Sequence, residues 1–329
     1  MSLSSARLSI AIPTCNHPEL VEQFIRHAYP SLIRHQLPVY ISDNSNNTDT
    51  ETMVQQLTLE YPHLKYRRNE SNKGFDYNCL QAITWPETAY VWPIGDGMLI
   101  NPDCIDQVMA QLDKGFDFIF LNYRIPHTSS QVIPFSRTHD WIVNNTWHLS
   151  CLGVTIFGER PRAMATNPSV IEWKKWEYFM HTGLILRFAT QYPCHFYWIA
   201  PYGLSGNPHK KESGWVSIAL TVFAIGWSRL IEGFSDVLTV DERRHMVRSH
   251  AEKTHIFEWP LLIHHRKTHH FNDDMWQAHA RALTHAVPLP SGWLALLARS
   301  PRWTLWLPVW NLLLIWYRIT EKMGYSQQY

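Results

Sequence analysis

The chain has 329 residues, of which 45% are apolar and 17% are charged, and this composition excludes a chain that is disordered throughout. Its length fits one large domain or two small ones with a sizeable buried core. The 29 lysines and arginines nearly balance the 28 aspartates and glutamates, so the sequence argues against a nucleic-acid binder that works through a generally basic surface.

The first 125 residues alternate between two hydrophobic periodicities. Short apolar runs predict strands over residues 8–12, 39–42, 64–67, 89–94 and 116–121. Helical patterns predict helices over residues 18–35, 48–59, 75–84 and 101–112. Strands that alternate with helices of this length are typical of βαβ units, so the predicted fold class is α/β with a mostly parallel sheet.

The middle of the chain is less regular. Apolar runs predict strands over residues 132–135, 152–157 and 196–200. Helical segments are predicted over residues 168–190, 216–230, 239–253 and 274–285. The chain therefore continues from an α/β part into a mainly helical part.

The tail, residues 291–329, contains five of the sixteen tryptophans and has an excess of positive charge. Its apolar run over 303–317 is interrupted by Pro308 and Asn311 and is shorter than the roughly 20 residues that a spanning helix needs. Such a segment predicts an amphipathic helix that lies in the membrane interface. The alternative is a C-terminal helix that packs on the protein's own core.

The cysteines and the N-terminus indicate the cellular compartment. The five cysteines are widely spaced without a Cys-X-X-Cys pair, which argues against a disulfide framework or a zinc knuckle. The N-terminus has no apolar stretch long enough for a signal peptide. Together with the tail, these features predict a cytoplasmic protein that is peripheral at the inner face of the cytoplasmic membrane.

Polar side chains follow each of the first four predicted strands. The residues are Pro13, Thr14, Cys15 and Asn16, then Asp43, Asn44 and Ser45, then Asn69, Asn72, Lys73, Gly74, Asp76 and Asn78, and finally Gly95, Asp96 and Gly97. In an open α/β sheet, ligands bind beyond the carboxyl ends of the strands. Neither a G-x-G-x-x-G loop nor a P-loop is present, which argues against a Rossmann dehydrogenase and a P-loop enzyme. What remains is a nucleotide site built from carboxylates, amides and a divalent metal.

These motifs, in this order along residues 1–125, resemble those of family 2 glycosyltransferases with the GT-A fold. They are Ile12-Pro13-Thr14-Cys15-Asn16, Asp43-Asn44-Ser45, Asn72-Lys73-Gly74 with Asn78, and Trp92-Pro93-Ile94-Gly95-Asp96. Residues 151–160 are in addition similar to the abequosyltransferase-like branch of bacterial O-antigen enzymes. The resemblance implies a GT-A-like, Rossmann-related, mostly parallel sheet flanked by helices, with a donor half (1–125) and an acceptor half (126–290). Beyond about residue 215 the resemblance carries nothing, and there the helical patterns predict a helical C-terminal extension that ends in the membrane-associating tail (291–329).

The resemblance also implies a nucleotide-sugar site. Its residues are Pro13, Thr14, Asn16, Asp43, Asn72, Lys73, Gly74, Asn78 and Asp96. Asp96 corresponds to the first carboxylate of the DXD-type motif, which holds Mg²⁺ or Mn²⁺ on the diphosphate. The family usually has two or three acidic residues here, whereas this chain has Asp96 between two glycines. The alternatives are a weakly bound metal, a basic side chain in place of the metal, or a simple turn residue.

An inverting transferase also needs a general base beside the acceptor hydroxyl. The candidates, in order of preference, are Glu177, Glu172, His181 and Asp140. Glu177 and His181 are four residues apart and are therefore predicted to share one face of a helix. The alternative is an exposed helix with ordinary charges.

The predicted function is that of an inverting hexosyl- or deoxyhexosyltransferase in bacterial surface polysaccharide synthesis. It would take a nucleotide-sugar donor and a glycan or lipid-linked oligosaccharide acceptor. A nucleotidyltransferase is the enzymatic alternative, but it should have a Gly-rich, basic loop after the first strand. The non-enzymatic alternative is a catalytically reduced GT-A-like scaffold subunit of a polysaccharide assembly complex, which the short motif around Asp96 favours.

Overall fold

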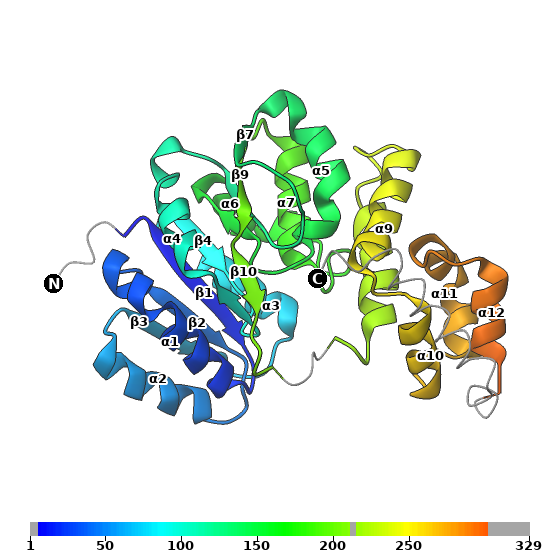
Figure 1. Ribbon diagram of the computed structural model, residues 1–329, viewed down its shortest axis with the longest axis horizontal. Coiled ribbons are helices and arrows are strands. Elements are labelled where there is room, and N and C mark those ends of the chain that lie inside the picture. Colours follow the sequence, from blue (N-terminus) through cyan, green and yellow to red (C-terminus); the bar gives the residue numbers. More distant parts are fainter. Residues whose placement is uncertain (1–5, 211–214, 302–329) are drawn as a thin grey trace. The chain divides into compact units, whose positions relative to one another are not determined.

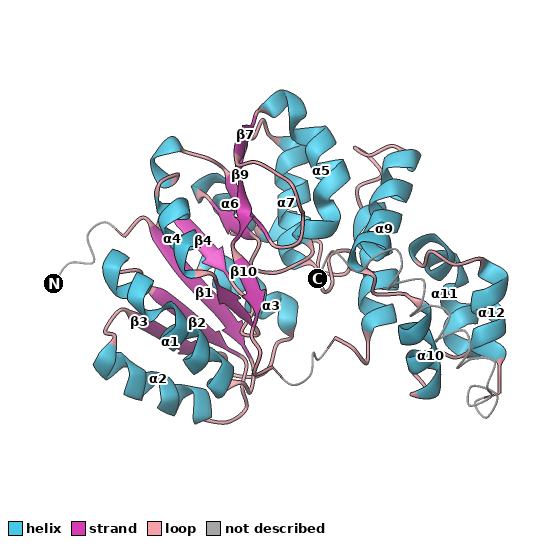
Figure 2. Cartoon of the chain, in the orientation of Figure 1, coloured by secondary structure: helices cyan, strands magenta, loops and turns pink. Residues whose placement is uncertain are grey.

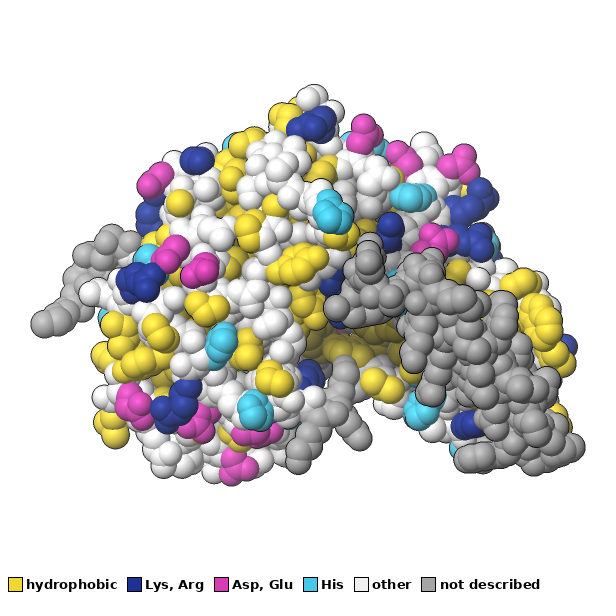
Figure 3. Space-filling model, in the orientation of Figure 1, with side chains coloured by type: hydrophobic (Ala, Val, Ile, Leu, Met, Phe, Trp, Pro, Cys, Tyr) yellow, Lys and Arg dark blue, Asp and Glu magenta, His cyan; other side chains and the backbone are white. Residues whose placement is uncertain are grey.

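The computed structural model describes residues 6–210 and 215–301. The chain forms two compact units, residues 1–212 and residues 213–329 (Figure 1). Each unit is described by itself below. On the face drawn in Figure 3, side chains of both charge signs are intermixed, in line with the near balance of charges in the sequence.

An eight-stranded sheet forms the centre of the first unit, with the strand order β3-β2-β1-β4-β8-β6-β9-β7. The strands are β1 (Leu8–Thr14), β2 (Val39–Asp43), β3 (Leu64–Arg68), β4 (Tyr90–Pro93), β6 (Phe118–Asn122), β7 (Gln131–Ile133), β8 (Thr155–Phe157) and β9 (Phe196–Tyr202). Strands β3, β2, β1 and β4 pair in parallel, as do β6 and β9, whereas β8 and β7 are antiparallel to their neighbours. The mostly parallel α/β sheet predicted from the sequence is confirmed.

Helices pack in two groups against this sheet (Figure 2). One group is α1 (Pro18–His35), α2 (Asp49–Glu60) and α4 (Pro102–Met109), and the other is α3 (Phe75–Thr84), α5 (Phe135–Leu149), α6 (Glu159–Ala165) and α7 (Met180–Gln191). Helix α1 begins at Pro18, whose fixed φ suits a first turn, and buries Leu20, Phe24 and Leu32 along one face. A short second sheet pairs β5 (Met98–Ile100) with β10 (Leu204–Gly206).

The structure differs from the sequence prediction in the middle of the first unit. The helix predicted over 168–190 is wrong over residues 171–179, which form turns between a short 3-10 segment, η2 (Pro168–Val170), and α7. Tyr178 has a φ of 73°, which an α-helix cannot contain, and its N–H donates to Asp76 Oδ2 at 2.8 Å. Helix α5 was not predicted, because its run of Asn144, Asn145 and Thr146 has low helix propensity.

The described part of the second unit is helical, which confirms the predicted helical C-terminal extension. Its elements are a π-helix, η3 (Leu220–Gly226), and the α-helices α8 (Trp227–Glu232), α9 (Val240–Thr254), α10 (Trp259–Lys267), α11 (Asp273–Ala286) and α12 (Ser291–Arg299). Helix α9 begins with a capping box between Thr239 and Glu242.

The predicted membrane-associating tail lies largely outside the described residues, which end at Pro301. Only its first segment, the helix α12, belongs to the described part of the chain. Among the described residues, no helix is both long and apolar enough to cross a membrane.

Candidate functional site

The carboxyl ends of β1, β2, β3 and β4 lie next to one another, so the four loops that follow them meet at one edge of the sheet. Thr14 pairs with Asp43 at the ends of β1 and β2. Asn44 N–H donates to Thr14 O at 2.9 Å, and Asn69 N–H donates to Asp43 O at 2.8 Å. Pro13 is buried within β1. The polar residues that follow these strands in the sequence are therefore neighbours in space.

The Asn78 side chain ties these loops together from inside the protein. Its Nδ2 group donates to Thr14 O at 3.0 Å and to Ser42 O at 2.9 Å. Its Oδ1 atom accepts from Ser42 Oγ at 2.6 Å and from Asn69 Nδ2 at 3.3 Å. Asn78 is only 3% exposed. Since its amide is fully used by the protein, Asn78 positions the loops from below rather than facing a ligand.

The Asp43 carboxylate has a similar organising role. It is completely buried, and its Oδ1 atom accepts from the Ser45 hydroxyl and, at 2.8 Å, from Ser45 N–H. Its Oδ2 atom accepts from Tyr66 OH at 2.9 Å. Burial and this hydrogen bond raise the pKa of Tyr66. Ser45 Oγ also accepts from Asn16 N–H at 2.7 Å, so Asp43 fixes the loop after β1 through Ser45.

The exposed rim of this edge contains Asn16, Asn72, Lys73 and Gly74. Gly74 has a φ of 86°, a conformation that favours glycine, and it leads directly into α3. The Gly74 N–H donates to Asn72 Oδ1 at 2.9 Å, and Lys73 Nζ lies 5.0 Å from the centre of the Tyr77 ring. These side chains and backbone groups are the ones at the edge that a ligand can reach.

Asp96 lies at the centre of the edge and is surrounded by groups that stabilise its negative charge. Its Oδ2 atom accepts from Thr14 Oγ1 at 2.9 Å and lies 3.0 Å from His17 Nδ1. Lys210 Nζ lies 4.0 Å from its Oδ1 atom. The hydrogen bond to Asp96 raises the pKa of His17. The Asp96 side chain is 14% exposed, so it remains within reach of a ligand.

Gly97 leaves room for Lys210. Strand β10 pairs with β5, and the next residue along the chain, Asn207, donates its N–H to Gly97 O at 2.9 Å. This bond holds the segment that contains Lys210 next to Asp96. A Cβ atom on Gly97 would overlap the Lys210 side chain. Sequence reasoning missed both cations near Asp96. His17 directly follows the first motif, which was a usable signal, whereas nothing in the sequence connects Lys210 with this site.

Of the four base candidates, Glu177 lies in a segment that is bonded to the start of α3, the helix that begins at this edge. It precedes Tyr178, whose N–H donates to Asp76 in the first turn of α3. His181 lies on α7 and is 2% exposed, with Nε2 at 3.1 Å from Ser150 O. Burial lowers the pKa of His181 to about 4. The prediction that Glu177 and His181 share a helical face is wrong, because Glu177 lies in a turn before α7 begins.

The other two candidates lie in surroundings that do not suit a base. Glu172 forms ion pairs with both Lys175 and Arg187, so its two carboxylate oxygens already have partners within the protein. Asp140 is exposed on α5. Thr138, two residues earlier, donates to Cys194 O at 3.1 Å, just before the amino end of β9. Asp140 is therefore not brought to the edge where Asp96 lies.

The donor set at the edge suits a phosphorylated ligand with a divalent cation. Within residues 6–210 and 215–301, no group of three or more His, Cys, Asp or Glu side chains could enclose a metal ion. Mg²⁺, however, is commonly held by one or two carboxylates together with substrate phosphates and water. The partly exposed Asp96 carboxylate fits that pattern, Lys210 supplies a positive charge beside it, and Lys73 supplies another on the exposed rim.

Residues 9–167 match the family model of glycosyl transferase family 2. A curated relative, abequosyltransferase RfbV of Salmonella typhimurium, is 28% identical over 138 residues. That match covers 41% of this chain and 41% of the relative, so it spans about two fifths of the relative's length.

Two solved structures have a similar fold. The mannosyltransferase PcManGT of Pyrobaculum calidifontis, in complex with GDP-Man and Mn²⁺, aligns with a TM-score of 0.52 and 12% identity over 98% of this chain and 88% of its own. Residues 1–349 of S. aureus TarS align with a TM-score of 0.50 and 15% identity over 88% of this chain and 83% of their own. At these identities the likeness shows the fold alone.

Proposed function

We propose that the chain transfers a sugar from a nucleoside-diphosphate donor to a glycan or lipid-linked oligosaccharide, because residues 9–167 match the family model of glycosyl transferase family 2. The observation that carries the proposal is the position of Asp96. Its carboxylate stands partly exposed where the loops after β1, β4 and β10 meet, next to His17 and Lys210. A donor diphosphate at this point is within reach of His17, of Lys210 and of the exposed rim.

In this proposal the nucleotide-sugar donor contacts the exposed rim, and the buried residues hold the loops of the rim in position. Asn16, Asn72, Lys73 and Gly74 supply exposed polar groups on either side of Asp96. Thr14, Asp43 and Asn78 act from within, through the hydrogen bonds that join the loops. Lys210 and Lys73 offset the charge of the diphosphate, which must increase on the leaving group as the bond to the sugar breaks.

We propose Asp96 as the protein ligand of Mg²⁺ or Mn²⁺, with the diphosphate and water as the remaining ligands. When bound, the metal would stabilise the charge of the departing diphosphate. The PcManGT structure, which contains GDP-Man and Mn²⁺, supports this choice.

The acceptor reaction proposed is a direct displacement with inversion. Glu177 takes the proton of the acceptor hydroxyl, whose oxygen attacks the anomeric carbon while the bond from that carbon to the diphosphate oxygen breaks. The products are the glycoside, with inverted configuration, and a nucleoside diphosphate. Glu177 is preferred because its segment is anchored to the first turn of α3, beside the rim.

We further propose a role in bacterial surface polysaccharide synthesis at the inner face of the cytoplasmic membrane. The similarity to abequosyltransferase RfbV supports the polysaccharide role. Exposed Trp293 and Leu296 on α12 support contact between the tail and a membrane surface. The division into a donor half (1–125), an acceptor half (126–290) and a membrane tail (291–329) belongs to the same proposal.

Thermal unfolding of the full chain with a panel of nucleoside diphosphates and sugar nucleotides, with and without Mn²⁺, tests the proposal. A ligand at about 100 times its Kd stabilises the native state by about 2.7 kcal/mol. We expect one nucleotide to stabilise the chain, and Mn²⁺ to strengthen this effect.

The matched variants are Asp96→Asn and Asp103→Asn. The second removes an exposed carboxylate at the start of α4, away from the edge. Asp96→Asn should lose both the nucleotide effect and turnover, whereas Asp103→Asn should keep them. If no nucleotide stabilises the chain at millimolar concentration, the scaffold alternative replaces the transferase.

A further inference from the structure

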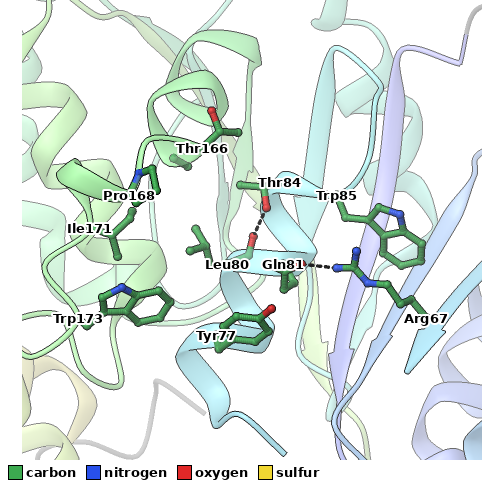
Figure 4. Close-up of a pocket in the computed structure, with 11 residues that line it drawn as sticks. Arg67, Tyr77, Leu80, Gln81, Thr84, Trp85, Thr166, Pro168, Ile171 and Trp173 are labelled. Carbon is green, nitrogen blue, oxygen red and sulfur yellow. Dashed lines mark hydrogen bonds between the residues drawn. The ribbon is translucent and has the colours of Figure 1, made fainter. Parts of the chain in front are cut away.

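A groove crosses the outer side of α3, away from the hydrogen bonds of Asn78 beneath the edge where Asp96 lies. This edge is called the donor edge below. It has a volume of about 450 Å³, within the range of small-molecule sites. Figure 4 shows Tyr77 and Trp173 on one side of it, and Trp85 with Arg67 on the other. All of these residues belong to the first unit.

The groove has exposed aromatic surfaces. The Tyr77 and Trp173 rings are nearly parallel, with an angle of 19° and their centres 6.4 Å apart. Trp173 is 44% exposed, which is unusual for so large an apolar side chain in a loop. Flat aromatic faces of this kind pack against the C–H bonds of sugar rings, and each gives apolar contact at low cost in side-chain entropy.

The polar groups of the groove are donors of the kind that sugar hydroxyls need. The Arg67 guanidinium lies 4.7 Å from the Trp85 ring and donates from Nη2 to Gln81 Oε1. Its Nε atom is buried and, within the described part of the chain, has no hydrogen-bond partner. A guanidinium that stacks on Trp85 and lines the groove can donate from its Nη groups to oxygen atoms of a ligand.

One end of the groove lies near the exposed rim at the edge of the sheet. Tyr77 is near Lys73 of the rim, and Trp173 lies four residues before Glu177 on the same turn segment. From Tyr77 to Trp85, α3 rises about 12 Å, at 1.5 Å for each residue. A chain whose reacting hydroxyl is at the donor edge can therefore extend along this groove.

We propose that the groove binds a saccharide unit of the acceptor, at a distance from the hydroxyl that reacts. The proposal rests on the proposed transferase function, because a glycan acceptor supplies such a unit. Aromatic faces next to a guanidinium and an amide suit a ligand rich in hydroxyls. A nucleobase could also stack here, and the test below distinguishes the two.

Saturation-transfer NMR on the full chain tests this proposal with free glucose, galactose, mannose, rhamnose, N-acetylglucosamine, maltose and lactose. At least one sugar should receive saturation from the protein. Trp173→Ala and Arg67→Met should each reduce its affinity, by roughly tenfold for the loss of one stacking partner. Trp293→Ala is the matched control, since Trp293 is 49% exposed but lies on α12, and it should leave the signal unchanged.

Three results would refute the proposal that the groove binds a saccharide. No sugar in the panel binds, the Trp173 and Arg67 variants bind the sugar as the wild type does, or a nucleoside diphosphate displaces the sugar completely. Nucleotide stabilisation of the same samples is measured in parallel. If sugar binding depends on Trp173 and no nucleotide stabilises the chain, the saccharide site is supported and the transferase function is refuted. If a nucleotide stabilises the chain but no sugar binds, the saccharide site alone is refuted.

Discussion

Replacing Asn78 by alanine tests whether the buried amide holds the donor loops in place. The substitution removes four hydrogen bonds, two donated to Thr14 O and Ser42 O and two accepted from Ser42 Oγ and Asn69 Nδ2. It should therefore destabilise the first unit and separate the loops after β1, β2 and β3. The nucleotide site should be lost with them, although Asn78 itself faces no ligand.

The magnitude follows from the fate of the four partners. At about 0.5–1.5 kcal/mol net for each, the bonds amount to about 2–6 kcal/mol. Thr14 O keeps the N–H of Asn44, and Asn69 Nδ2 keeps Asn44 Oδ1, so the cost should be in the lower half of this range, about 3 kcal/mol. For a unit of this size, about 3 kcal/mol lowers the Tm by about 6–12 °C.

The assay is thermal unfolding of the full chain, followed by near-UV circular dichroism with and without the nucleotide that stabilises the wild type. Asn144→Ala is the control, because this exposed amide donates to Asp140 O within α5. It should change the Tm by little. A loss below about 1 kcal/mol for Asn78→Ala, with nucleotide stabilisation retained, would refute the idea that this amide organises the site.

Two further predictions follow from the same structure. Gly97→Ala places a Cβ where the flexible Lys210 side chain lies, so it should weaken nucleoside-diphosphate binding in calorimetry with little change in Tm; unchanged affinity would contradict the placement of Lys210. Burial lowers the pKa of His148 to about 3 and that of His181 to about 4, so both stay neutral when folded, whereas in the unfolded chain they bind protons below about pH 6.5. Stability should therefore be fully present above pH 6.5 and fall as the pH drops towards 4, by up to about 1.4 kcal/mol for each histidine and pH unit; a Tm that stays level over this range would contradict it.

The sequence predicts the fold best where local signals and tertiary packing agree. The helix over 18–35 was predicted with both ends, because Pro18 marks its start and its apolar residues recur on one face. The helix prediction was wrong over residues 171–179 because there the local pattern and the tertiary contacts disagree. There a side chain distant in sequence, Asp76, fixes the backbone of Tyr178 in a left-handed turn, and no local pattern contains that information.

The location of the candidate site was predictable, but the part played by each residue was not. Parallel strands place their carboxyl ends at one edge, so the motifs had to meet. Whether an amide points outward depends on tertiary hydrogen bonds, which is why Asn72 is exposed and Asn78 is buried although both follow β3. Lys210 reaches the site only because β10 pairs with β5, a contact between segments that share no sequence signal.

The single carboxylate at Asp96 changes the charge balance that a diphosphate meets. Two or three carboxylates would repel it until a divalent cation was bound. Here the charge of Asp96 is already offset by Lys210 Nζ at 4.0 Å, and His17 Nδ1 lies 3.0 Å away. The protein's own cations should therefore share the task of neutralising the leaving group with the metal.

This balance predicts that Lys210→Ala weakens nucleoside-diphosphate binding more than removal of divalent cations does. Loss of one charge-assisted contact should cost roughly tenfold in affinity. Calorimetry on the wild type with EDTA or Mn²⁺, and on Lys210→Ala, measures both effects, with the exposed Lys174→Ala as the control. If EDTA abolishes binding to the wild type while Lys210→Ala binds normally, Asp96 acts through the metal alone, and the position of Lys210 beside it has no role in recognising the donor.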